Sequence, residues 1–323
     1  MAEPLNESLA WDIMRVTEAA AISAAKWRGQ GDEMAADKAA IEAMHTELAK
    51  LTITGQIVIG EGEEDEVTSL YVGETLGSNG GPSVDIAVDP LEGTTLCAKS
   101  LPNGLSVLAL AEAGSILKTP DIYMEKIAIG PGYPEDVISL EKSPTENLEA
   151  LAKAKDVKVS DLTACILDRS RHGKLIAEVR DTGAAVNLIG DGDIAGVIQV
   201  TDPAETGIDI YLGVGGAPAG VLAASALKAL GGNMHCRFQP LQEGHKQKAY
   251  KAGIEDLSKI YTISDMVKGD VIFAATGITT GYMLEGVRFS PEVIETETLV
   301  MHSGTKSVRW VKSQRCAALA NGE

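Results

Sequence analysis

Aromatic residues are scarce in this chain, at 4% of 323 residues, so aliphatic side chains must form most of its core. The four cysteines lie far apart and form no Cys-x-x-Cys pair, which favours free thiols and a cytoplasmic location. No uncharged apolar run of about 18 residues occurs, so no membrane span is expected. Residues 1–4 also lack the basic and apolar regions of a secretory signal.

Basic residues are also few, because 28 Lys and Arg stand against 46 Asp and Glu, for a formal net charge of −18. Phosphate contacts need clustered cations, so nucleic acid is not an expected partner. An acidic pocket would repel a phosphate substrate unless bound divalent metals reversed the local charge. Much of the excess acid is also explained as solvated surface. The sequence has no His-Glu-x-x-His, Gly-x-Ser-x-Gly or Walker glycine-lysine motif, which argues against zinc, serine and P-loop hydrolases.

The stretch at residues 84–95 combines an apolar strand with acids, a turn and hydroxyls. Residues 84–88 alternate in the manner of a pleated strand, and Asp89 follows where the apolar run stops. Because Pro90 has no N–H, the strand is expected to end there.

The residues after this strand have the chemistry of a metal site. Glu92 is a second acid, Gly93 permits a tight turn, and Thr94 supplies a hydroxyl where a helix or turn would begin. Carboxylates at the end of a strand suit hard cations such as Mg²⁺ or Mn²⁺. A capped strand-to-turn junction is the alternative interpretation.

A second acidic turn follows the apolar residues 57–59. Residues 60–66 contain five acids, with Glu61 between two glycines. Such acids repel one another unless they are solvated or neutralised by cations. Two strand ends that present carboxylates can share two metals about 3.5–4 Å apart.

The periodicity predicts an α/β protein with helices over residues 8–28 and 33–51. A domain boundary is expected near residue 158, dividing the chain into a metal-binding α+β domain at 1–158 and a substrate-phosphate domain at 159–323. The second half alternates strands with helices, which predicts βαβ units and a mostly parallel sheet.

Phosphate-binding chemistry follows three consecutive strands of this second half. Ligands of such sheets bind beyond the carboxyl ends of the strands. There the chain carries Arg169 and Arg171, an acidic glycine loop at residues 190–193, and Gly215-Gly216 before a helix. Arginines bind phosphate through paired donors, and a helix N-terminus favours anions. Spacing alone leaves Tyr123 open as a core edge residue or a phosphate ligand, and residues 276–281 as a phosphate cradle or a turn.

These motifs resemble a known family. Asp89-Pro90-Leu91-Glu92-Gly93-Thr94 is similar to the metal motif of the lithium-sensitive phosphatases, which include inositol monophosphatases. Together with residues 60–63, 121–126, 190–193 and 215–218, it resembles class II fructose-1,6-bisphosphatase over nearly the whole chain, from Arg15 to Arg315. The resemblance implies a layered α/β/α/β/α fold, with a mixed sheet in the first half, and hydrolysis of the 1-phosphate of fructose 1,6-bisphosphate in gluconeogenesis.

The resemblance also implies roles for individual residues, with Mn²⁺ or Mg²⁺ as cofactor. The implied metal ligands are Asp37, Glu61, Asp89 and Glu92. The implied substrate contacts are Glu92, Gly93, Thr94, Tyr123, Arg169, Ser170, Arg171, Asp191, Gly192, Asp193 and Gly216. Thr94 and Asp65 would orient or deprotonate the attacking water. The family also implies a homo-oligomer, a dimer or tetramer.

One position departs from the family pattern. The loop at 215–220 normally carries a metal-binding glutamate after its proline, and this chain has Ala219 there. The substitution is expected to weaken a metal site or lower activity. Three alternatives stay open: a related phosphatase acting on sedoheptulose 1,7-bisphosphate, an inositol phosphate or a nucleotide 3′-phosphate; a non-catalytic sugar-phosphate binder; and a general cation-binding acidic protein.

Overall fold

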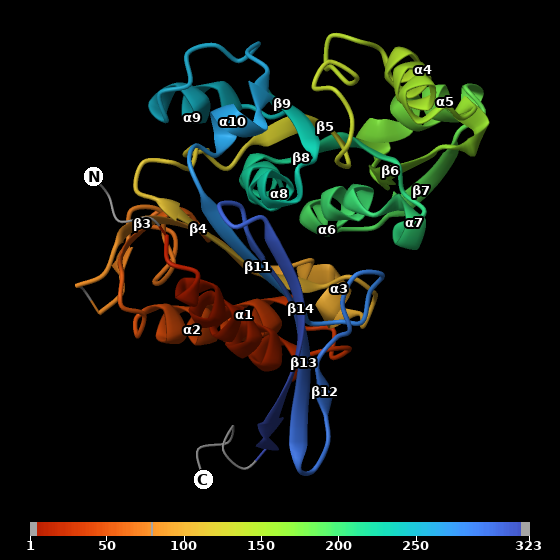
Figure 1. Cartoon of the computed structure of the whole chain (residues 1–323). Helices are drawn as coiled ribbons and strands as arrows, with labels where there is room; N and C mark the ends of the chain where they lie inside the picture. The colour runs from red at the N-terminus through yellow and green to blue at the C-terminus, as the bar shows by residue number, and fades with distance from the viewer. Residues whose placement is uncertain (1–4, 79, 318–323) are drawn as a thin grey trace. The chain divides into compact units, whose positions relative to one another are not determined.

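The structure is a computed structural model that describes residues 5–78 and 80–317, and Figure 1 labels its elements. The chain forms two compact units. Unit 1 comprises Met1–Ile116 and Gly269–Glu323, and unit 2 comprises Leu117–Lys268. The first unit therefore contains segments from both halves of the sequence, and the second is one continuous segment.

This division differs from the boundary predicted at residue 158. The predicted domains, 1–158 and 159–323, cut through unit 2 and assign its second part to the C-terminal segment. The prediction is wrong because the chain returns after residue 268 and adds β11, β13 and β14 to the sheet of unit 1. Strand pairing between residues so far apart leaves no local signal in the sequence.

The sheet of unit 1 is mixed, as predicted for the first half of the chain. β1 and β3 are parallel, and the other neighbouring strands run antiparallel. In spatial order the strands are β12 (Arg288–Phe289), β13 (Val293–His302), β11 (Val271–Gly277), β4 (Leu105–Glu112), β3 (Ser83–Glu92), β1 (Thr54–Ile59) and β2 (Thr75–Leu76), and β14 (Ser307–Cys316) pairs with β13.

Two N-terminal helices, α1 (Ser8–Ala25) and α2 (Glu33–Leu48), pack on this sheet and form its core (Figure 1). Both begin at the predicted residues and end three residues earlier than predicted. Asp32 is the N-cap residue of α2, because its carboxylate accepts the N–H of Ala35 at 2.9 Å and so caps the first turn.

β3 is longer than the sequence predicted. It continues through Pro90 to Glu92, and its register against β4 shifts between Asp89 and Glu92. The expectation that Pro90 ends the strand is wrong, because the missing N–H is accommodated at this irregularity in the ladder. The short helix α3 (Thr94–Ala98) follows at once, with Gly93 in the left-handed conformation at φ 81°.

The sheet of unit 2 is mixed rather than mostly parallel. In spatial order its strands are β10 (Tyr261–Thr262), β9 (Asn233–Gln239), β5 (Tyr123–Ile129), β8 (Ile210–Gly216), β6 (Thr163–Leu167) and β7 (Ala185–Ile189). β6, β7, β8 and β9 share one direction, as the alternating pattern predicted. β5 lies antiparallel between β8 and β9, and β10 runs antiparallel at the edge. The prediction of a mostly parallel sheet is therefore wrong, because β5 and β10 pair antiparallel with strands distant in the chain and local periodicity carries no information on such pairing.

Helices pack on both faces of this sheet. Ile127 and Leu212 join the apolar core beside α4 (Pro144–Lys155) and α5 (Gly173–Asp181). The residues of β5 and β8 that alternate with these point to the opposite face of the sheet. That face is covered by α6 (Asp193–Ile198) and α8 (Ala217–Leu230). The remaining helices are α7 (Pro203–Thr206), α9 (His245–Lys251) and α10 (Ile263–Met266), with 3₁₀ turns at Val159–Asp161, Ser170–His172 and Gln199–Thr201.

Within the described residues, no helix is both long enough and apolar enough to cross a membrane. The predicted α/β class is confirmed, since each unit combines a mixed sheet with packed helices.

Candidate active site

Three acids of unit 1 lie close enough to influence one another electrostatically. β1 and β3 are parallel neighbours, and Ile59 pairs with Ala87. Glu61 and Asp89 each follow two residues after this pair, so the register brings them to the same level of the sheet. Asp37 joins them from α2, which packs against β3.

The pKa of Glu61 is raised well above its usual value, first by burial and then by the negative charges of Asp89 and Asp37. Burial also raises the pKa of Asp37. Carboxylates that share a partly dry site resist ionisation together, and a divalent cation would relieve both the burial cost and the repulsion. The residues present therefore fit a hard cation such as Mg²⁺ or Mn²⁺.

The same acids are not arranged as a finished coordination shell. Among the described residues, no group of three or more His, Cys, Asp or Glu side chains is placed to hold a metal ion. Electrostatic proximity of Glu61, Asp89 and Asp37 therefore supports a metal site, and the assignment of individual ligands stays a prediction.

The residues after Asp89 form a buried corner. Glu92 is 5% exposed, Gly93 is buried and precedes α3, and Thr94 is half-buried as the first residue of that helix. Asp65 lies in an exposed turn between β1 and β2. The predicted cooperation of Asp65 with Thr94 stays a prediction.

In unit 2 the structure brings Tyr123, Gly216 and Arg171 together. The antiparallel register of β5 and β8 places Tyr123 opposite Gly216. The Arg171 guanidinium lies 5.0 Å from the centre of the Tyr123 ring, which is a cation–π contact. Nε and Nη2 of Arg171 donate to the carbonyl oxygen of Val214, at 2.9 and 2.6 Å. An arginine, a phenol and the N-terminus of α8 thus lie at one corner of unit 2, and the guanidinium and the helix N-terminus are groups that favour an anion.

A second pair of predicted residues meets at the edge of this sheet. Nη2 of Arg169 lies 3.7 Å from a carboxylate oxygen of Asp191, and both side chains are partly exposed. Gly192 has φ 88°, which glycine adopts without strain, and its N–H donates to the side chain of Asp191 at 3.1 Å. Ser170 is exposed in the 3₁₀ turn beside Arg169.

Asp193 differs from its neighbours, because its carboxylate points into the protein. It is 7% exposed and forms an ion pair with Lys126. It also accepts a hydrogen bond from the hydroxyl of Tyr211. Neither partner was singled out from the sequence, although Lys126 is a charged residue in an apolar strand and alternation puts it on the face opposite Tyr123.

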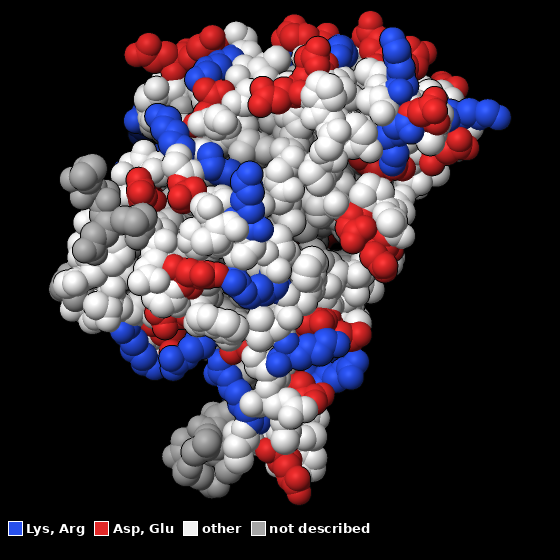
Figure 2. Space-filling model, in the orientation of Figure 1, with Lys and Arg blue, Asp and Glu red and all other residues white. Residues whose placement is uncertain are grey.

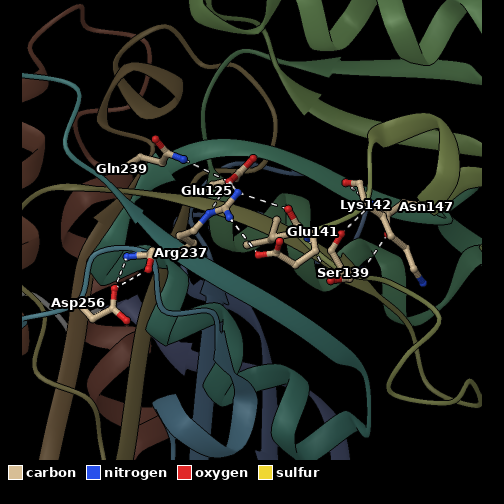
Figure 3. Close-up of polar contacts among 10 residues, drawn as sticks. Glu125, Ser139, Glu141, Lys142, Asn147, Arg237, Gln239 and Asp256 are labelled. Carbon is tan, nitrogen blue, oxygen red and sulfur yellow. Dashed lines mark hydrogen bonds and ion pairs between the residues drawn. The ribbon is translucent and has the colours of Figure 1, made fainter.

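A polar cluster that the sequence did not indicate lies on the same face of β5 as Tyr123. Arg237 donates through Nη2 and Nε to Glu125, at 2.7 and 3.2 Å, and Gln239 donates to the same carboxylate at 3.2 Å. Arg237 also forms an ion pair with Glu141, with Nη1 3.4 Å from a carboxylate oxygen; Figure 3 draws this contact. The cluster links β5 and β9 to the segment that leads into α4.

Ala219 is half-buried in the first turn of α8, where no acidic residue is present. This turn begins directly after Gly216. A glutamate at this position would be favoured by the helix dipole.

Over the face seen in Figure 2, acidic and basic side chains are interspersed.

Comparison with known proteins identifies relatives of the whole chain. Residues 7–315 match the family described as "Bacterial fructose-1,6-bisphosphatase, glpX-encoded". A protein of Synechococcus sp. (strain RCC307), named "D-fructose 1,6-bisphosphatase class 2/sedoheptulose 1,7-bisphosphatase", is 41% identical over 320 residues, 95% of each chain. A protein of the same name from Prochlorococcus marinus (strain MIT 9312) is 39% identical over 323 residues, 96% of each chain.

Solved structures include a distant neighbour of this chain. The inositol monophosphatase from Anabaena (Nostoc) sp. PCC 7120 aligns with a TM-score of 0.37 and 13% identity, over 77% of this chain and 96% of the other.

Proposed function

Because the chain belongs to the bacterial fructose-1,6-bisphosphatase family, we propose that it hydrolyses the 1-phosphate of fructose 1,6-bisphosphate. The products are fructose 6-phosphate and inorganic phosphate. The observation that carries the proposal is the group of Glu61, Asp89 and Asp37, in which burial and then mutual repulsion raise the pKa of Glu61, so that a cation would be favoured there.

The metal ligands proposed in unit 1 are Asp37, Glu61, Asp89 and Glu92, and Mn²⁺ or Mg²⁺ is the cation. A bound divalent cation would supply Lewis-acid polarisation of the phosphate and offset the charge that develops on the leaving oxygen. Thr94, at the start of α3, orients the attacking water through its hydroxyl, with Asp65 as the proton acceptor.

The reaction balances as a simple hydrolysis. The oxygen of water forms a bond to phosphorus, and the bond from phosphorus to the oxygen on carbon 1 of the sugar breaks. That oxygen takes up a proton, and the water loses one toward Asp65.

Unit 2 supplies the groups that hold a sugar phosphate. Arg171 and Tyr123 contact each other, and Tyr123 pairs with Gly216 at the N-terminus of α8. A guanidinium and the amides of a helix N-terminus both favour phosphate. Arg169 and the turn at residues 190–193 complete the proposed phosphate contacts.

A second substrate is supported by the relatives. Both curated relatives carry sedoheptulose 1,7-bisphosphatase in their names, so a seven-carbon bisphosphate is the second candidate. The non-catalytic binder remains the alternative that Ala219 motivates. The four cysteines are free, which fits the cytoplasmic setting proposed here, and a dimer or tetramer is the proposed assembly.

The decisive experiment is an assay of phosphate release. The purified chain is given fructose 1,6-bisphosphate, sedoheptulose 1,7-bisphosphate and inositol 1-phosphate, with Mn²⁺, with Mg²⁺ or with EDTA. Release from the sugar bisphosphates that stops in EDTA and returns with metal is the expected result. Release that EDTA does not change would contradict the metal mechanism, and binding without release would favour the non-catalytic alternative.

A further inference from the structure

Three buried polar groups of unit 2 are linked in one network. Lys126 is 1% exposed, Asp193 is 7% exposed and Tyr211 is fully buried. The Lys126 ammonium pairs with one carboxylate oxygen of Asp193, and the Tyr211 hydroxyl donates to the other. The network joins three elements, because Lys126 lies on β5, Tyr211 on β8, and Asp193 at the start of α6.

The surrounding backbone is shaped around this network. A Cβ atom on Gly215 would lie 1.7 Å from the Asp193 carboxylate, so only glycine lets the carboxylate lie against β8. A Cβ atom on Gly196 would lie 3.1 Å from the Tyr211 ring. Burial raises the pKa of the neighbouring Cys236 thiol to about 12, so this thiol stays neutral beside the ion pair.

A buried ion pair is poor at stabilising a fold, because losing water costs each charge about as much as the pairing returns. Such a pair does hold one geometry, since either charge left alone in the interior would be strongly unfavourable. The geometry held here is that of the turn at residues 190–193. The strands β5 and β8, which carry Lys126 and Tyr211, also carry Tyr123 and Gly216. The network therefore connects the turn to the corner formed by Tyr123, Gly216 and Arg171.

We propose that Lys126 and Tyr211 are positioning residues, which fix the turn at residues 190–193 by holding the inward-pointing carboxylate of Asp193. In place of the direct substrate contact that the resemblance implies for it, Asp193 then acts on substrate binding only by holding this turn in position. Asp191 and Gly192 are the members of the turn that meet the sugar phosphate. This inference rests on the function proposed above.

A double-substitution experiment tests it. Asp193→Asn leaves the Lys126 ammonium buried without a counter-charge, and adding Lys126→Met makes the site neutral again. The KM for fructose 1,6-bisphosphate is expected to rise roughly tenfold in Asp193→Asn and to return most of the way in the double variant. Tyr211→Phe, which removes one donor, is expected to raise KM about threefold with kcat little changed.

A matched pair of charges provides the control. Lys155 and Asp209 form a partly buried ion pair just before the first residue of β8, at the opposite end of that strand from Gly216. Asp209→Asn is expected to lower the unfolding temperature as Asp193→Asn does, while KM stays within about twofold of the wild type. A change in KM confined to the Lys126–Asp193 pair would support positioning.

Two results would overturn the inference. If the double variant recovers its unfolding temperature but keeps the high KM of Asp193→Asn, Asp193 contacts the substrate directly. If KM is unchanged in every variant, the network serves stability alone. The proposed function is checked separately by the wild-type chain. Should that chain release no phosphate, the proposed function fails, and the same variants are compared by the thermal shift that fructose 6-phosphate produces.

Discussion

Nε2 of His172 lies 2.8 Å from the backbone nitrogen of Val214 and accepts its N–H, while Nδ1 lies 2.8 Å from the carbonyl oxygen of Leu167. Nε2 can accept this hydrogen bond only if it carries no proton. The hydrogen-bond network therefore assigns the neutral ring with its proton on Nδ1. Arg171 binds the carbonyl oxygen of the same Val214. Adjacent residues therefore hold both polar backbone groups of Val214, two positions before Gly216.

This arrangement predicts a loss of stability in mild acid. Burial lowers the pKa of His172, so the unfolded chain binds a proton on this residue at a higher pH than the folded chain does. The contribution of His172 to the free energy of unfolding is fully present above its unfolded pKa, about 6.5. It is lost as the pH falls from there through the lower folded pKa, by up to about 1.4 kcal/mol per pH unit. Urea unfolding between pH 7.5 and 5 measures the slope.

The control for this slope is His172→Gln, which cannot titrate. Its unfolding free energy is expected to depend less steeply on pH over the same range. Burial also lowers the pKa of His235, and this residue is present in both proteins, so its contribution cancels. Equal slopes in the two proteins would show that His172 does not cause the acid sensitivity.

The acid group of unit 1 predicts opposite effects of Glu61→Gln with and without metal. In EDTA a raised pKa means that ionised Glu61 costs stability above its unfolded pKa, so Glu61→Gln is expected to raise the unfolding midpoint at pH 7. With Mn²⁺ at 100 times its dissociation constant the wild type gains about 2.7 kcal/mol. Loss of a ligand should weaken metal affinity by roughly 10–100-fold or more, so the variant should keep about 1.4 kcal/mol of this gain at a 10-fold loss and about 0.4 kcal/mol at a 100-fold loss.

Glu64→Gln is the matched control for this experiment, since Glu64 is an exposed acid of the same turn. Its midpoint and its response to Mn²⁺ should match those of the wild type. Equal stabilisation of the Glu61→Gln and wild-type chains by Mn²⁺ would remove Glu61 from the metal site.

Ala219→Glu is expected to raise the rate of phosphate release. The resemblance places a metal-binding glutamate at this position, and the first turn of α8 favours an acid through the helix dipole. The gain in kcat/KM with Mn²⁺ should be about tenfold or more. The control is Ala219→Gln, because glutamine has nearly the same size as glutamate and no charge. Equal rates in the two variants would show that the missing carboxylate does not limit the reaction.

Gly215→Ala is expected to disturb the site through packing. The new methyl group would lie 1.7 Å from the Asp193 carboxylate and must displace it. Overpacking of this kind costs about 1–3 kcal/mol, and KM should rise with it. Gly173→Ala is the control, because no heavy atom lies within 4 Å of a Cβ there and the backbone is helical at φ −54°. A normal KM in Gly215→Ala would separate the position of Asp193 from substrate binding.

The sequence by itself determined most of the local structure of this protein. α1 and α2 begin at the predicted residues, 8 and 33, and a helix follows Gly216 as the pattern placed it. Periodicity and turn residues act over a few neighbours, so they can be read without a partner. The motifs that resemble the family also led to the family that the relatives confirm.

Only the tertiary structure decided which segments pair. The passage of β3 beyond Pro90, the insertion of β5 between β8 and β9, and the return of β11 to the first sheet all depend on partners distant in the chain. The buried pairing of Asp193 with Lys126, 67 residues away, has the same origin. Burial and long-range contact set these features, and a local pattern records the apolar face of a strand but not the neighbour it will meet.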